Sequence, residues 1–180
     1  IVAALQYPTQ FNPVNNWISD MGNYDKNPAG AIIFNACAFV AGLLLVPFFA
    51  GLASWYYVQR KDKYYYVAAE LFGFVGALGL VMIGIFQQGT SLHSLWAMVC
   101  FGSLVIVFIV AGRALLRNPE FNRLIGYYGY VAALIGLIFF VLFVGMTDTP
   151  IFMEWLTVYG AFLWILLVSF NALSPNKAVR

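Results

Sequence analysis

The side chains best suited to chemistry lie beside long apolar stretches of this sequence. Asp20 belongs to the segment Trp-Ile-Ser-Asp-Met-Gly, Glu154 lies near the start of an apolar run, and His93 is the only histidine. Ionisable groups in or beside a membrane are costly, so they indicate function by default. The catalytic candidates are Ser19, Asp20, His93 and Glu154. The ligand-binding candidates are Asp20, Asn35, Gln87, His93, Asp148 and Glu154.

Three kinds of chemistry suit this set. Asp20, His93 and Glu154 have the ligand types that bind a divalent metal and activate water. Ser19 or Ser91, with His93 and a carboxylate, has the composition of a nucleophilic relay. The same polar groups would also bind a lipid head group without reacting with it.

A structural role accounts for the same residues. His93 would hold the loop around Asp20, and Asp20 would cap a short turn. Glu154 would stabilise a helix by placing its negative charge in the first turn, near the positive end of the macrodipole. The sequence has no HExxH or GxSxG motif, and a single histidine excludes a three-histidine zinc site and a bis-histidine haem. It therefore assigns no metal and no cofactor, and it favours a role other than catalysis.

The elements that must position these residues are membrane helices. Of the 180 residues, 63% are hydrophobic and only 9% are charged, whereas a soluble domain has about 25% charged residues. Spanning a bilayer takes about 20 apolar residues in a helix. Five continuous stretches meet this length, and they are too long for barrel strands. The predicted helices are about 28–58, 65–87, 91–116, 123–146 and 150–173.

The sequence thus predicts an all-α integral membrane bundle in a single domain, 1–180. The pairs Asn27-Pro28 and Thr149-Pro150 favour helix starts, and Thr90 or Ser91 would cap the third long helix. The apolar residues 1–5 have the character of the end of a sixth, preceding helix. The one substantial loop, 6–27, is rich in Asn, Pro and Gly.

The basic residues predict the orientation. Eight of the nine lysines and arginines fall at three places that this topology puts on one side, and only Lys26 falls on the other. Because positive charge is retained in the cytoplasm, we expect a cytoplasmic C-terminus and a non-cytoplasmic loop 6–27. The dispersed basic residues give no support for nucleic-acid binding.

Small residues mark the positions where backbones can approach closely. Glycine and alanine recur in the second long helix, a pattern that favours close helix packing in lipid. Packing within the chain is one interpretation, and a dimer interface is the alternative. The glycines assigned to structural motifs are Gly22, Gly73, Gly76 and Gly79.

Several of these motifs resemble a known family. Ser19-Asp20-Met-Gly22, Phe34-Asn35 and the glycine-rich helix that ends before His93 are similar to the domain of unknown function 998 family of polytopic membrane proteins. Phe86-Gln87 with His93 also resembles the damage-regulated autophagy modulator superfamily, which includes proteins of GPI-anchor lipid remodelling. The resemblance implies a six-helix bundle and no settled activity.

Three functions remain open from the sequence. The first is a lipid-associated protein that binds lipids or helps to rearrange them at the outer leaflet. The second is an accessory subunit of a larger membrane complex, with other membrane proteins as partners. The third is a membrane hydrolase that uses the cluster of Asp, His and Glu.

Overall fold

A computed structural model describes residues 1–52, 54, 60–119, 121–145 and 151–173 of the chain. Its elements are all helical over this part of the sequence, and five of the helices are long and apolar enough to cross a membrane. The predicted all-α bundle is therefore confirmed. The five long helices are α2 (Ala31–Leu52), α3 (Lys63–Ile85), α4 (Ser91–Arg117), α5 (Arg123–Gly145) and α6 (Ile151–Leu173).

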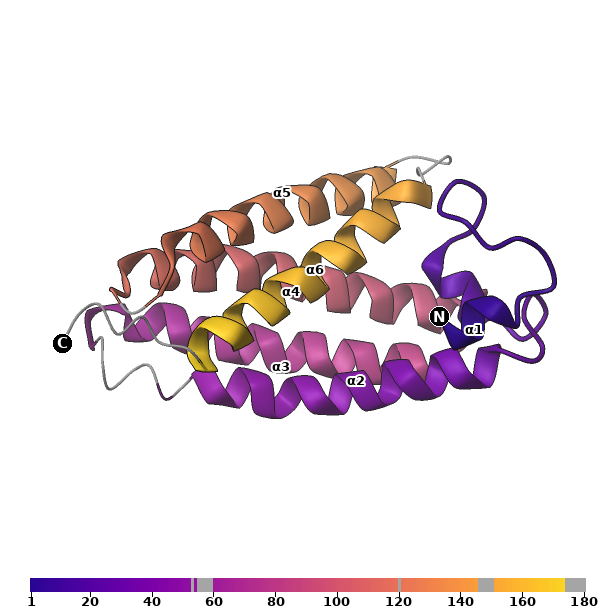
Figure 1. Cartoon of the computed structure of the whole chain (residues 1–180), viewed down its shortest axis with the longest axis horizontal. Coiled ribbons are helices and arrows are strands. Elements are labelled where there is room, and N and C mark those ends of the chain that lie inside the picture. Colours follow the sequence, from indigo (N-terminus) through magenta and orange to yellow (C-terminus); the bar gives the residue numbers. More distant parts are fainter. Residues whose placement is uncertain (53, 55–59, 120, 146–150, 174–180) are drawn as a thin grey trace.

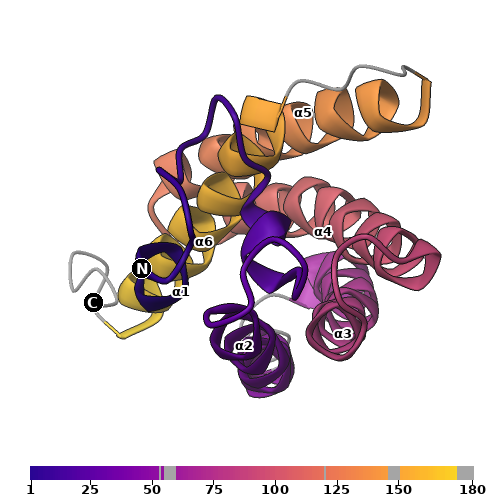
Figure 2. The same cartoon turned by 90° about the vertical axis from the view of Figure 1, so that its right-hand side faces the viewer.

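Three short helices complete the described elements. They are α1 (Val2–Leu5) and the 3-10 helices η1 (Ile18–Gly22) and η3 (Arg60–Asp62). The long helices run back and forth along one axis, and loop 6–27 with η1 lies at the end of the bundle where α2 begins (Figure 1). Viewed along that axis, α3 lies between α2 and α4, while α5 packs on α4 and α6 on α5 (Figure 2).

The helix limits differ from the predicted ones where side chains compete with the backbone. The prediction began the first long helix at residue 28, but α2 begins at Ala31. The Asn27 side chain accepts a hydrogen bond from the N–H of Gly30 at 3.2 Å, so residues 27–30 form a turn before the helix. At the same end of the bundle Thr90 caps α4, one of the two caps predicted there, by accepting the His93 N–H at 3.2 Å. The predicted ends at 58 and 146 and the predicted Thr149-Pro150 cap lie outside the described residues.

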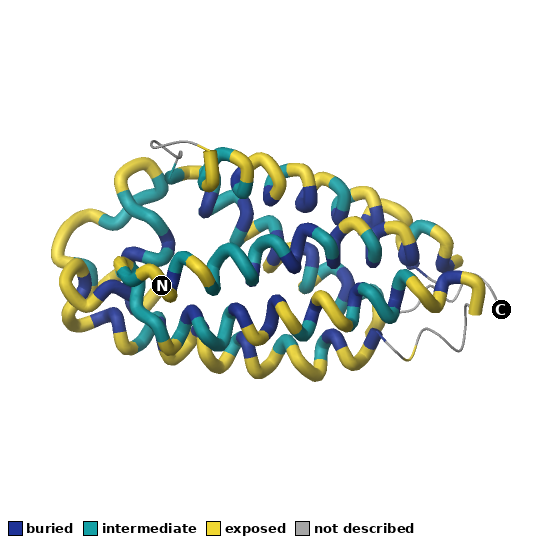
Figure 3. The backbone as a smooth tube through the Cα atoms, turned by 180° about the vertical axis from the view of Figure 1, so that it is seen from behind, coloured by how far each residue is buried: buried dark blue, intermediate teal, exposed yellow. Residues whose placement is uncertain are grey.

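Burial follows the helix faces that point into the bundle. Inward faces are buried and outward faces carry exposed apolar side chains, as expected for helices in lipid (Figure 3). Trp164 of α6 is fully buried and packs edge-to-face on Phe108 of α4, with ring centroids 5.2 Å apart. It also meets Phe48 of α2 at 6.5 Å. A single large aromatic side chain thus joins α6 to helices far earlier in the sequence.

The glycines of α3 allow its neighbours to approach on two sides. A Cβ atom at Gly73 would collide with the Phe49 ring of α2, and one at Gly79 would lie 2.9 Å from the backbone of Cys100 in α4. At Gly76 the nearest atoms would lie 3.6 Å away, which is ordinary contact. Close helix contacts of this kind are the main source of packing energy between helices in lipid.

This contrast predicts that Gly79→Ala destabilises the bundle and Gly76→Ala does not. The first substitution forces α3 and α4 apart, at a cost of roughly 1–3 kcal/mol for overpacking. The second adds a methyl group in ordinary contact and gains up to about 1 kcal/mol in helix propensity. Thermal unfolding of both variants in one detergent would measure the difference. Equal midpoints would contradict the packing described for α3 and α4.

Candidate functional site

Loop 6–27 is built around the buried carboxylate of Asp20. One carboxylate oxygen accepts the N–H of Trp17 at 3.1 Å, and the other pairs with the Lys26 ammonium at 2.6 Å. These contacts fix the turn of η1 and connect its start to the end of the loop. Asp20 is therefore committed to the loop itself, with only 3% of the residue exposed.

Two neighbouring residues in the first turn of α6 attach the loop to the bundle. The Glu154 carboxylate accepts the N–H of Ile18 at 2.6 Å, and it also hydrogen-bonds Ser19 through the hydroxyl and the backbone N–H of that residue. The Trp155 indole N–H donates to the carbonyl oxygen of Asn16 at 2.8 Å. Buried backbone donors are costly when unpaired, so these bonds determine where η1 lies against α6.

The opposite side of the loop is attached to α2 and to the α3–α4 turn. The Asn35 amide donates to the carbonyl oxygen of Gly22 at 3.0 Å, and a Cβ atom at Gly22 would collide with the Asn35 side chain. Asn23 donates to the Gln88 side chain at 2.6 Å, and the Gln87 side-chain oxygen accepts the N–H of Tyr24 at 3.4 Å. Loop 6–27 therefore bridges several helix ends.

His93 lies buried in the first turn of α4. Its Nδ1 atom is 2.9 Å from the carbonyl oxygen of Phe86. A carbonyl oxygen only accepts, so Nδ1 carries the hydrogen, and Nε2 of the neutral ring remains an acceptor. This contact ties α4 to the end of α3, around a turn in which Gly89 has a φ of 98° that favours glycine.

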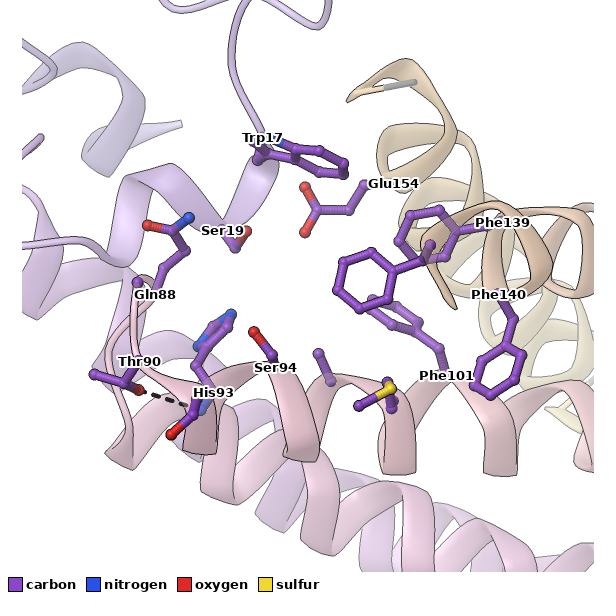
Figure 4. Close-up of a pocket in the computed structure, with 15 residues that line it drawn as sticks. Trp17, Ser19, Gln88, Thr90, His93, Ser94, Phe101, Phe139, Phe140 and Glu154 are labelled. Atoms are coloured by element: carbon purple, nitrogen blue, oxygen red, sulfur yellow. Dashed lines mark hydrogen bonds between the residues drawn. The ribbon is translucent and has the colours of Figure 1, made fainter. Parts of the chain in front are cut away.

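Beneath the loop lies a cavity of about 360 Å³. Its polar end is formed by Trp17, Glu154, Ser19 and His93, while Phe101, Phe139 and Phe140 lie toward the other end (Figure 4). Such a cavity, apolar over most of its lining with a few convergent polar groups, is typical of a ligand site. The remaining lining residues are Gln88, Gly89, Thr90, Ser91, Ser94, Ala97, Met98 and Phe143.

The structure brings some of the predicted site residues together and separates others. Ser19, His93 and Glu154 line the cavity, and so does Ser91. Asp20, Asn35 and Gln87 instead hold the loop through the hydrogen bonds described above. Asp148 lies outside the described residues.

The metal-site hypothesis is not supported by this arrangement. Within the described ranges, no group of three or more His, Cys, Asp or Glu side chains is placed to hold a metal ion. Asp20, His93 and Glu154 therefore do not form a metal centre. Asp20 is also occupied by Trp17 and Lys26, so it does not serve as the acid of a relay through His93.

Sequence reasoning missed the apolar half of the site and much of the anchoring. Phe139, Phe140 and Phe143 recur at helical spacing in α5, but the same pattern is common in any membrane helix. No sequence signal predicts that the Trp155 indole donates to the carbonyl oxygen of Asn16, in a loop far earlier in the chain.

Together these features define a multi-pass α-helical membrane protein in which a polar loop covers an amphiphilic pocket at one end of the bundle. The family model described as "Protein of unknown function (DUF998)" matches residues 1–171, and the chain belongs to this family. The resemblance inferred from the Ser-Asp-Met-Gly and Phe-Asn motifs is thereby confirmed. No curated protein and no solved structure matches the chain.

The anchoring of the loop predicts that Asp20→Ala exposes it to protease. The substitution removes the acceptor of the Trp17 N–H and the partner of Lys26. Loss of the hydrogen bond to Trp17 alone should lower the free energy that holds the loop in place by about 1 kcal/mol. Trypsin should therefore cleave after Lys26 about fivefold faster or more. The rate of cleavage after Lys61, at the far end of the bundle, serves as the internal reference.

Asn15→Ala is the matched control for this experiment. Asn15 is an exposed residue of the same loop, and the hydrogen bond at this residue uses its backbone N–H. Its substitution should leave cleavage after Lys26 unchanged. Equal cleavage of the two variants would show that the Asp20 carboxylate does not hold the loop.

Proposed function

We propose that this protein binds a membrane lipid in the pocket beneath loop 6–27, with the head group at the polar end and an acyl chain along the phenylalanines. The observation that carries the proposal is that one cavity has polar side chains at one end and apolar side chains at the other. Glu154, His93 and several hydroxyl groups lie at one end, and Phe101, Phe139 and Phe140 lie at the other (Figure 4).

The position of the pocket supports a lipid rather than a water-soluble ligand. Its polar residues come from loop 6–27 and the first turns of α4 and α6, so they lie at the level of the helix ends, while Phe101 and Phe139 lie further along α4 and α5. A lipid in a bilayer has the same order, with the head group at the interface and the chain below it. The volume of about 360 Å³ is enough for a head group and the upper part of a chain.

The basic residues support a location in the outer leaflet. Arg60, Lys61 and Arg117 lie at the end of the bundle opposite the loop. Under the positive-inside rule we expect that end to face the cytoplasm and the pocket to lie at the non-cytoplasmic surface.

A hydrolase is the weaker candidate, because Asp20 has other partners and the described residues offer no complete relay. A role as an accessory subunit predicts protein partners instead of a bound lipid. Gentle extraction followed by native mass spectrometry separates these functions. A lone chain that retains lipid supports the proposal, and a stoichiometric protein complex without lipid contradicts it.

Filling the pocket should reduce the retained lipid. Ala97→Phe introduces a ring into the cavity wall, and we expect the fraction of chains that retain lipid in native mass spectra to fall at least severalfold. Leu95→Phe is the control, because Leu95 lies on the same helix and is 48% exposed, away from the cavity lining. Equal lipid retention by the two variants would mean that the bound lipid lies elsewhere.

A further inference from the structure

One buried carboxyl group in the pocket wall, that of Glu154, belongs to neither of the ion pairs found in the described residues. Glu154 is 7% exposed and takes its hydrogen bonds from neutral donors, namely Ile18 and Ser19. The ion pairs found within the described part of the chain join Lys26 to Asp20 and Arg117 to Asp62. Burial of an unpaired carboxylate is costly.

The described residues around Glu154 place no cation beside its carboxyl group. Asp20 is the neighbouring charged group that acts on Glu154, and it has the same sign. Its charge is already balanced by Lys26 at 2.6 Å. The ion pair and Glu154 together therefore give the polar end of the pocket no net positive charge, and they leave one buried carboxyl group with no cationic partner among the described residues.

The other polar groups of the pocket are rich in acceptors. Nε2 of His93 is an acceptor because Nδ1 donates to Phe86. Ser91 and Ser94 add hydroxyl oxygens, and the described residues that line the cavity include no lysine and no arginine. A head group with a net negative charge would therefore find no side-chain cation among them to offset it.

We propose that the pocket selects an amphiphile whose head group carries a primary ammonium, an inference that rests on the proposed lipid-binding function. The ammonium group offers three N–H donors, which suit the Glu154 carboxylate and the His93 Nε2 atom. Trp17 lies on the same side of the cavity as Glu154 (Figure 4), and aromatic faces attract cations. An aminolipid of the membrane and a free long-chain amine share this chemistry.

The test is a competition between lipids with identical acyl chains. The full chain in mild detergent is given an equimolar mixture of phosphatidylethanolamine, phosphatidylcholine and phosphatidylglycerol, and the bound species are counted by native mass spectrometry. We expect phosphatidylethanolamine to be enriched about tenfold or more over phosphatidylglycerol, the effect of one charge-assisted hydrogen bond. Phosphatidylcholine, which lacks N–H donors, should be retained less than phosphatidylethanolamine.

Dodecylamine distinguishes the two sources of the amine. Displacement of phosphatidylethanolamine by dodecylamine would assign the recognition to the amine and chain alone. Retention of phosphatidylethanolamine against dodecylamine would assign it to the whole aminolipid. Equal retention of phosphatidylethanolamine and phosphatidylglycerol by the wild type, or an excess of phosphatidylglycerol, would overturn the proposal without use of any variant.

Glu154→Gln connects the selectivity to the carboxylate. Glutamine has nearly the same volume and keeps an acceptor for the Ile18 N–H, so among the lipid that the variant still binds, the preference for phosphatidylethanolamine should fall below about twofold. A preference unchanged from wild type in a folded variant would overturn the role of Glu154. If the wild type retains lipid without head-group preference, only the selectivity fails, whereas absence of any retained lipid contradicts the proposed function as well.

Discussion

The structure depends on how the backbone N–H groups of a polar loop obtain hydrogen-bond partners at the end of an apolar bundle. Backbone N–H groups that leave water must find partners, and loop 6–27 finds them on helix ends. The bond from the Ile18 N–H to Glu154 joins residues 136 positions apart. It places η1 over the gap between α4 and α6, and this position gives the pocket its polar roof. The Glu154 carboxylate and the Trp155 indole together fix the position of the loop on α6.

The bundle below provides the apolar half of the same site. Glycines allow α3 to approach both α2 and α4 closely, and Trp164 joins α6 to Phe108 of α4. These contacts hold the helices at fixed distances, so the phenylalanines of α4 and α5 face a cavity of defined size. The polar and apolar halves therefore arise from separate causes, namely loop anchoring and helix packing. Their meeting in one pocket supports an amphiphilic ligand.

The fold could be predicted from the sequence to a large extent because each long helix corresponds to an apolar run that must span the bilayer. The start of α2 was the exception, because the Asn27 side chain forms a local turn that periodicity does not reveal. The site was harder to predict. Asp20 and Glu154 are both acids at the same membrane face, yet one is committed to Lys26 and the other lines the cavity. The two roles differ because of contacts between segments far apart in the sequence, which the sequence does not reveal.

Photolabelling with a diazirine lipid, followed by peptide mapping, would show whether a lipid occupies the pocket between the loop and the phenylalanines of α4 and α5. We expect labelling of α4 and α5 residues of the pocket, such as Met98 and Phe140, that unlabelled lipid competes away. Labelling spread over the exposed faces of α2 and α3, with no saturable component in the pocket, would contradict this expectation.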